Sequence, residues 1–124
     1  MTDTTTIYAP HAEQALIGAL FIDHGQYPDI AQIVGPDDFE PSSGRGELFA
    51  ALGKIPYDAE ADGVMTIESL REIVGDEAYE RVGRYDGVTA MCRACPDPCN
   101  APYYAKLIAE AAWKRKFLTM IDEL

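Results

Sequence analysis

The last 25 residues, Asn100 to Leu124, are the segment that most constrains the fold, because they contain no glycine and only one proline, Pro102. Asparagine favours helix N-caps, and proline is well tolerated in a first helical turn. The segment therefore predicts one uninterrupted helix of about 36 Å, at a rise of about 1.5 Å per residue. A domain of this size has a radius of gyration of only about 14 Å, so part of the helix is expected to extend beyond the core.

Apolar side chains recur along this predicted helix at spacings of three, four and seven residues, which places several of them on one face. Such a face packs either against the core of its own domain or, along its outer part, against another chain. Aromatic and large apolar side chains dominate the energetics of interfaces. The predicted contact residues are Tyr103, Tyr104, Leu107, Ala111, Phe117, Leu118 and Ile121.

The apolar pattern continues to Leu124, whereas a helix end more often shows a glycine or a cap. We therefore expect the chain to be a piece of a larger protein. Its function is then expected to lie in what the domain joins and not in a pocket of its own.

Glycine and proline divide the rest of the chain into short segments with helical spacing. No useful stretch alternates apolar and polar residues, so we predict an all-α fold: a compact multi-helix head with a long C-terminal helix. A short β pair around Ile55 or Val88 is the one exception considered. Residues 1–7 are expected to form a disordered tail, and residues 8–124 a single domain. The predicted helices are 10–23, 28–34, one through Leu48, Phe49 and Leu52 that Gly53 ends, 67–74 capped by Thr66, and a turn over 76–82 capped by Asp76, after which Gly83 and Gly87 break the pattern.

The formal charge of −11, from 21 acidic and 10 basic residues, opposes binding to the phosphate backbone of nucleic acids. Direct binding of DNA by this domain alone is therefore not expected. Four of the basic residues lie in the last stretch, which could meet an acidic partner or a DNA strand: Lys106, Lys114, Arg115 and Lys116. No apolar run is long enough to cross a bilayer and the N-terminus lacks the features of a signal peptide, so we expect a cytoplasmic protein.

Three cysteines, Cys92, Cys95 and Cys99, form a C-x-x-C-x-x-x-C pattern. The first pair has the separation that lets two thiolates bind one zinc ion, and a zinc or iron–sulfur site is the alternative reading of this segment. A fourth ligand is missing nearby. The simpler interpretation is three reduced thiols in and around a proline-rich turn, with no cofactor.

Motifs for catalysis are absent: there is no glycine-rich phosphate loop, no G-x-S-x-G elbow and no H-E-x-x-H pair. The acidic pairs Asp37/Asp38 and Glu60/Asp62 lie in predicted loops with no histidine or arginine close in sequence to tune them. We interpret them as solvated surface groups. The chain is therefore not expected to be an enzyme.

Two stretches, Ala12–Asp23 and Asn100–Ile108, resemble the N-terminal domain of DnaB-type replicative helicases. In that family, an opening helix with an Ala-Glu-Gln-x-x-x-Gly pattern precedes a short helix and an Asp-Phe turn, which corresponds here to Pro36–Phe39. The segment Thr66–Leu70 is similar to the next helix of the family. An Asn-Ala-x-Tyr-Tyr-Ala segment then opens the long late helix.

The resemblance implies an all-helical head that pairs with copies of itself in the collar of a ring-shaped helicase and that, in many members, docks primase. The ATP-binding motor is absent from the sequence. The chain departs from the family pattern at Met91–Cys99 and at Ile55–Val64, which suggests a divergent member such as one from a phage. The leading hypothesis is a non-catalytic domain for oligomerisation, as a homodimer or larger homo-oligomer, and for docking of a primase-type partner. The alternative is a small metal-binding regulatory module at the three cysteines.

Overall fold

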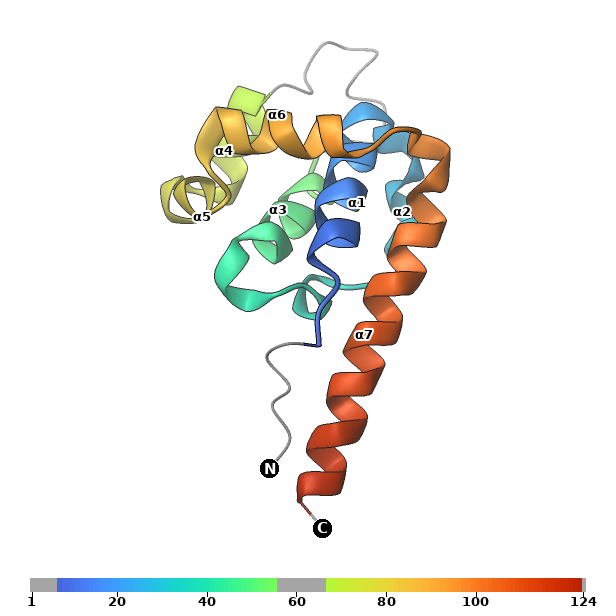
Figure 1. Ribbon diagram of the computed structural model, residues 1–124. Helices are drawn as coiled ribbons and strands as arrows, with labels where there is room; N and C mark the ends of the chain where they lie inside the picture. Colours follow the sequence, from blue (N-terminus) through green and yellow to red (C-terminus); the bar gives the residue numbers. More distant parts are fainter. Residues whose placement is uncertain (1–6, 56–66, 124) are drawn as a thin grey trace.

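A computed structural model describes residues 7–55 and 67–123, and within these ranges the chain is helical and contains no strand (Figure 1). This confirms the all-α prediction. The β pair considered at Ile55 or Val88 is not formed, because Val88 is buried inside a helix. The elements are α1 (Pro10–Ile22), η2 (His24–Gln26), α2 (Tyr27–Ile30), η3 (Pro36–Asp38), η4 (Pro41–Ser43), α3 (Arg45–Leu52), α4 (Ile67–Val74), α5 (Asp76–Arg81), α6 (Arg84–Ala94), η5 (Pro98–Asn100) and α7 (Ala101–Asp122).

Helix α1 is the centre of the head, with α3, α6 and α7 packed around it (Figure 1). Pro10 occupies its first turn, where a missing N–H costs nothing, and Glu13 lies near the positive end of the helix dipole. Eight of its 13 residues are buried, including Leu16, Ile17 and Leu20. Because α1 is enclosed on most sides, it organises the core.

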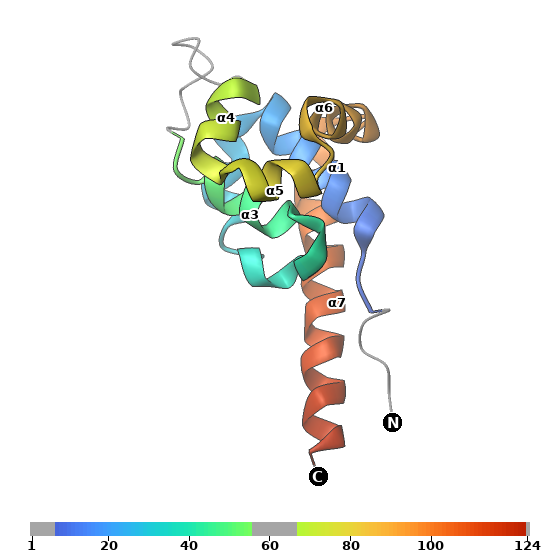
Figure 2. The same ribbon diagram turned by 90° about the vertical axis from the view of Figure 1, so that its left-hand side faces the viewer.

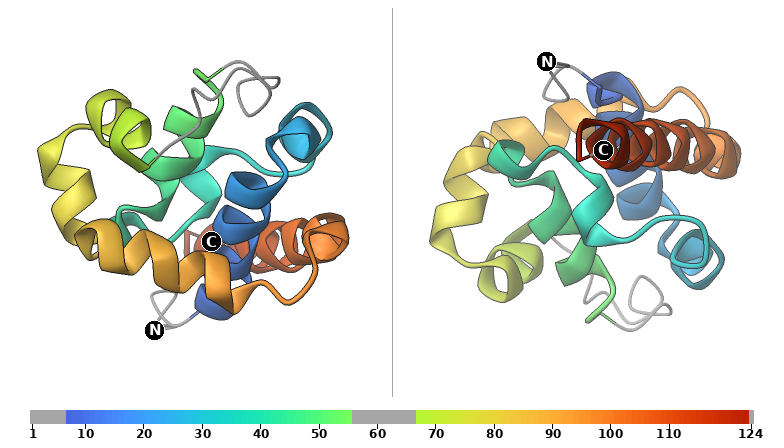
Figure 3. Two further views of the ribbon diagram at one scale, coloured as in Figure 1. Left: turned by 90° about the horizontal axis from the view of Figure 1, so that it is seen from above. Right: turned by 90° about the horizontal axis from the view of Figure 1, so that it is seen from below.

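The most extensive helix contact in the head is the crossing of α6 over α1 (Figure 3). A Cβ added at Gly18 would overlap the carbonyl oxygen of Met91, so only glycine permits this approach of the two backbones. The predicted interruption at Gly87 is wrong, because α6 runs through it. A Cβ at Gly87 would overlap the carbonyl oxygen of Val82, so this glycine lets α6 pack on the end of α5.

Smaller differences from the predicted helices concern their ends. Helix α2 ends at Ile30, and turns replace the rest of the predicted segment 28–34. Asp76 is the first residue of α5 and not its cap, because Gly75 takes that position. Asn100 does stand at the N-cap of α7, but its side chain makes no capping hydrogen bond. The Thr66 cap, most of the tail predicted at 1–7 and the loop after Ile55 lie outside the described residues.

The long helix α7 runs alongside the head over its first half and then passes beyond it (Figures 1 and 2). Its 22 residues correspond to about 33 Å at a rise of about 1.5 Å per residue. The overhang predicted from helix length is therefore present. In the part of the chain that the structure describes, no helix is long and apolar enough to cross a membrane.

Candidate protein–protein interface

Helix α7 faces the head through small side chains. Ala101, Ala105, Ile108 and Ala112 are the buried residues of this helix, spaced by three and four as one helical face requires. Small side chains allow α7 to lie close against α1, with which it makes most of its contacts. The buried face ends at Ala112, where the helix leaves the head.

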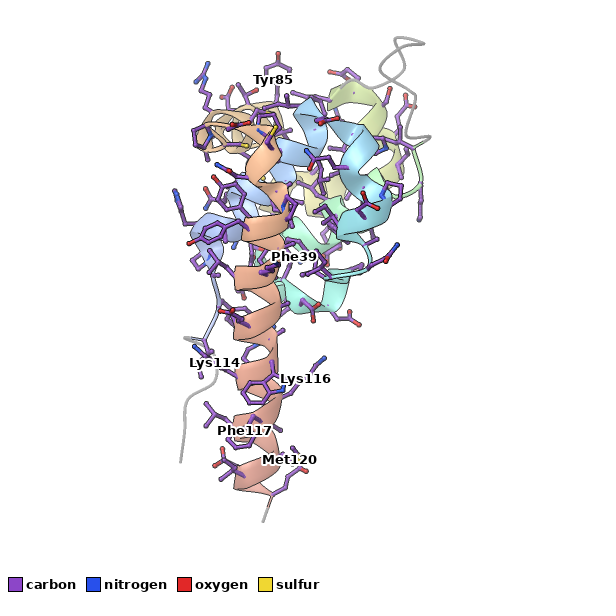
Figure 4. The ribbon with its side chains drawn as sticks, turned by 90° about the vertical axis from the view of Figure 1, so that its right-hand side faces the viewer. Phe39, Tyr85, Lys114, Lys116, Phe117 and Met120 are labelled. Carbon is purple, nitrogen blue, oxygen red and sulfur yellow. The ribbon has the colours of Figure 1, made fainter. Side chains whose placement is uncertain are left out.

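The opposite face of α7 carries large apolar side chains that stay exposed on the described chain. We call Trp113, Phe117, Met120 and Ile121 the outer stripe; 64%, 44%, 58% and 45% of their respective surfaces are exposed. Figure 4 shows Phe117 and Met120 on the projecting part of the helix, where they lie beyond Lys114 and Lys116 on the way to the C-terminal end. A helix that is apolar on both faces normally buries both, so the outer stripe predicts a second protein surface.

Two members of the outer stripe pack on each other. The rings of Trp113 and Phe117 are stacked, with centroids 5.3 Å apart and planes inclined by 7°. They lie one helical turn apart, as i and i+4 residues do. The predicted interface omitted Trp113 and Met120, although the spacing of residues 113, 117 and 120 by four and three places them on one face of a helix. A preorganised aromatic pair loses little side-chain entropy when a partner binds.

The predicted contact residues lie in the outer stripe or beside it, and none of them belongs to the buried face. Tyr103 is exposed and lies edge-on to Tyr104, at 5.9 Å between centroids. Phe117 and Ile121 belong to the stripe. Tyr104, Leu107, Ala111 and Leu118 are half-buried along its side. Their role as contact residues stays a prediction.

A groove of about 580 Å³ follows that half-buried side of α7. The segment Ile7–Ala9 forms one wall, and the other wall comes from α7. Most of its lining is apolar, with one charge of each sign contributed by Glu110 and Lys114. The remaining lining residues are Leu107, Ala111, Phe117 and Leu118. The groove and the outer stripe make one continuous apolar surface, because Phe117 belongs to both.

Charge separates this surface from the rest of the chain. Residues 1–100 carry 18 acidic and six basic side chains, whereas residues 113–121 carry three basic and no acidic ones. Two of the three, Lys114 and Lys116, are exposed beside the stripe (Figure 4). The third, Arg115, is turned toward the head and contacts the segment that precedes α1. The projecting half of α7 is thus a basic and apolar element on an acidic protein.

The three cysteines give the metal-binding alternative no support, which corrects that hypothesis. Cys92 is half-buried, Cys95 is buried and Cys99 is exposed. Burial raises the pKa of the Cys92 and Cys95 thiols, and a hydrogen bond to Asp97 with the charge of that residue raises the pKa of Cys99. Among residues 7–55 and 67–123, no group of three or more potential ligand side chains can hold a metal ion.

The remaining polar candidates have structural surroundings. A carboxylate oxygen of Asp38 accepts a hydrogen bond from the backbone N–H of Gly35 at 2.9 Å and so closes the turn that contains η3. Glu60 and Asp62 lie outside the described residues. His24 is buried, with its Nε2 atom 2.8 Å from the carbonyl oxygen of Ile55. Asp38 and His24 are thus each explained by a contact within the head, whereas Asp37 lines a cavity of about 320 Å³ together with Glu40 and Glu47.

Comparison with known protein families identifies the chain. A model of the DnaB-like helicase N-terminal domain matches residues 5–110. The chain belongs to this family. The resemblance read from the α1 and α7 motifs is thereby confirmed.

Full-length relatives agree with this assignment of the DnaB-like domain. The chain is 26% identical over 107 residues to the replicative DNA helicase DnaB of Geobacillus stearothermophilus, which covers 86% of this chain and 23% of the relative. It is 27% identical over the same length, with the same coverage, to the replicative DNA helicase DnaC of Bacillus subtilis. A DnaB helicase of Treponema pallidum is 26% identical over 113 residues, 88% of this chain and 25% of the relative. The chain thus spans about a quarter of the length of the relatives it matches.

The family motif in α1 has a structural task in this DnaB-like domain. The Glu13 side chain is 1% exposed and accepts a hydrogen bond from Nε of Arg45 at 2.9 Å. Its two carboxylate oxygens are each 3.2 Å from the backbone N–H of Glu40. Glu13 therefore joins α1 to α3 and to the loop between them. The outer stripe, by contrast, begins after residue 110, where the family match ends.

Proposed function

We propose that this chain is a non-catalytic domain of a replicative DNA helicase that joins copies of itself and docks partner proteins. Its membership of the DnaB-like N-terminal domain family supports the setting in DNA replication. The relatives it matches are replicative helicases about four times its length. A bacterial or phage helicase works in the cytoplasm, where the proposal places the protein.

The exposed outer stripe is the observation that carries the self-association half of the proposal. Burying a large apolar side chain contributes about 1.5–3 kcal/mol, and a few residues near the centre of an interface, tryptophan among the commonest, contribute most of its affinity. Trp113 and Phe117 have this arrangement before any partner binds. We take a second copy of the chain as the occupant, because the apolar surface continues from the stripe into the groove beside it and so offers a neighbouring helix a long contact.

Light scattering coupled to size-exclusion chromatography tests self-association. The wild-type chain is expected to give a molar mass of at least twice 13.6 kDa at tens of micromolar. The double variant Trp113→Ser/Phe117→Ser is expected to be monomeric with an unchanged helical circular dichroism spectrum. Tyr85→Ser is the matched control, because Tyr85 is a 56% exposed aromatic residue at the other end of the molecule (Figure 4). A monomeric wild-type chain, or equal loss in Tyr85→Ser, would contradict the proposal.

Partner docking is the second half of the proposal, with primase as the expected partner from the family resemblance. The acidic head is the surface that self-association through α7 leaves open. Mixing the chain with the primase of the same organism, followed by chromatography, is expected to give a co-eluting complex. The Trp113→Ser/Phe117→Ser variant should still bind if the head is the docking surface. Separate elution of the wild-type chain and primase would remove this half and leave self-association unaffected.

A further inference from the structure

We propose that Arg115 is a positioning residue that fixes the direction in which the projecting half of α7 leaves the head. Its value for assembly rests on the proposed function, since it would hold the outer stripe in one orientation toward a second copy. The mechanical role itself concerns a single chain. It is argued from three contacts that converge on one guanidinium group.

The Arg115 side chain ties together three segments that are distant in the sequence. Its Nη1 atom donates a hydrogen bond to the carbonyl oxygen of Ile7 at 2.7 Å, and its Nη2 atom donates one to the carbonyl oxygen of Asp38 at 2.9 Å. The plane of Tyr8 lies against the guanidinium, with 3.9 Å from the Cζ atom to the ring centroid. One side chain therefore joins α7 to the segment before α1 and to the turn that contains η3.

The position of Arg115 along α7 explains why these contacts control direction. The buried face runs through Ala105, Ile108 and Ala112, and Arg115 is the next residue three positions further on. It lies where the apolar packing on the head stops. Beyond it, the helix has the groove wall Ile7–Ala9 on one side and no packed core beneath it. Arg115 is thus the last anchoring point before the helix projects.

Arginine suits this anchor better than lysine does. The planar guanidinium donates two hydrogen bonds in fixed directions while stacking on an aromatic ring, whereas an ammonium group is a compact point charge. Both acceptors are backbone carbonyls. The carboxylate of Asp38 is already bound to the N–H of Gly35, so the anchor does not depend on an ion pair with it.

The anchor also sets which face of the helix is presented. Successive residues turn by about 100° around an α-helix, so Trp113 and Arg115 point in nearly opposite directions. Holding Arg115 against the head keeps Trp113 and Phe117 turned outward. Release of the anchor is expected to leave the helix intact but to let its projecting half sway and rotate.

Time-resolved fluorescence anisotropy of Trp113, the only tryptophan of the chain, measures this motion without a label. At a dilution where all proteins have the same molar mass by light scattering, Arg115→Ala is expected to raise the fast-decaying share of the anisotropy about twofold, as for a freed element. Arg115→Lys should fall between this variant and the wild type. Lys116→Ala is the matched control, because it removes the same charge from an exposed neighbour. A decay in Arg115→Ala and Arg115→Lys equal to that of Lys116→Ala would overturn the proposal.

A second measurement separates this inference from the proposed function. If the chain self-associates, Arg115→Ala should weaken the association about tenfold, because a helix that moves freely on the head must be fixed in one orientation on binding. Unchanged association together with a changed anisotropy would confirm the anchor and contradict its value for assembly. A wild-type chain that stays monomeric would refute the proposed function, while the anisotropy would still decide the role of Arg115. Circular dichroism confirms that each variant is folded.

Discussion

From Ala101 to Ala112, α7 turns small side chains toward the head, whereas from Trp113 to Ile121 its large apolar side chains face away from it. Both halves belong to one continuous helix. The small side chains are enclosed within the chain, so their packing stabilises the fold. The large ones stay in contact with water in a single copy and contribute little to folding. The apolar content of a helix therefore does not show whether its side chains stabilise the fold or are available for assembly. That depends on whether another part of the same chain packs against them.

The largest expected effect on stability comes from comparing an ion pair in the interior of the head with one on its surface. Glu13→Gln should lower the free energy of unfolding by about 3–5 kcal/mol, because it leaves the nearly buried Arg45 without its charged partner. Urea denaturation followed by circular dichroism measures this. Glu47→Gln is the control, since its ion pair with Arg81 is solvent-exposed and should change stability by less than about 0.5 kcal/mol. Equal effects would mean that the Glu13 pair is not an interior one.

The next prediction compares the two halves of α7 directly. Ile108→Ala should cost about 2–4 kcal/mol of stability, because it opens a cavity beside α1. Phe117→Ala should change the stability of the monomer by less than about 0.5 kcal/mol, because its side chain is exposed. Unfolding at a concentration where both proteins are monomeric tests the contrast. A loss of stability in Phe117→Ala as large as that in Ile108→Ala would show that the outer stripe is enclosed in a single copy.

Salt distinguishes a second copy from an acidic partner on the outer half of α7. Association through α7 would bring together the basic segments around Lys114 and Lys116 of two copies, on chains that each carry a net charge of −11. Raising the salt concentration from about 0.05 M to about 0.5 M should therefore tighten self-association a few-fold, by screening this repulsion. Sedimentation equilibrium at both concentrations measures the change. Weaker association at high salt would instead indicate attraction between opposite charges.

The smallest effect concerns a thiol of the head. Burial raises the pKa of Cys92, so the folded chain holds this proton more tightly than the unfolded chain. The resulting contribution to stability is present below the ordinary thiol pKa of 9.0 and is lost as the pH rises through the higher folded value. The melting temperature should thus fall between about pH 8 and about pH 10, and fall less in Cys92→Ser. Cys99→Ser is the comparison: the pKa of Cys99 is raised by a hydrogen bond to Asp97 and by the charge of that residue at an exposed site, where solvent screens the effect, so its fall should lie between those of Cys92→Ser and the wild type.

Much of the fold could be predicted from the sequence, because its helices are bounded by Gly, Pro and polar residues. Proline at 10 and glycine at 53 mark helix ends that the structure also has. Helix α6 was missed because Gly87 reads locally as a helix breaker. Only the contact of Gly87 with the backbone of Val82, which a sequence does not display, explains a glycine within that helix.

For the candidate interface, the helix that carries it could be predicted, but not which face of that helix is buried. The helix and its overhang followed from length. The buried face escaped notice because three of its four residues are alanines, which carry a weak hydrophobic signal. Large residues such as Tyr104 and Leu107 were predicted as contact residues instead, although they lie half-buried beside the outer stripe. Which face of a helix meets the core depends on the shape of the neighbouring helix, here α1, and so on tertiary contacts.

Because α7 is held on the head mainly by a short row of alanines, a small change in its packing there moves its projecting end. The buried face from Ala101 to Ala112 spans about 17 Å, and the projecting part from Ala112 to Asp122 spans about 15 Å. A small tilt at one end is therefore reproduced at nearly full size at the far tip. A bulkier residue at Ala105 would pivot the helix and displace Met120 without touching it. Sequence changes deep in the head can in this way alter the direction in which the outer stripe points.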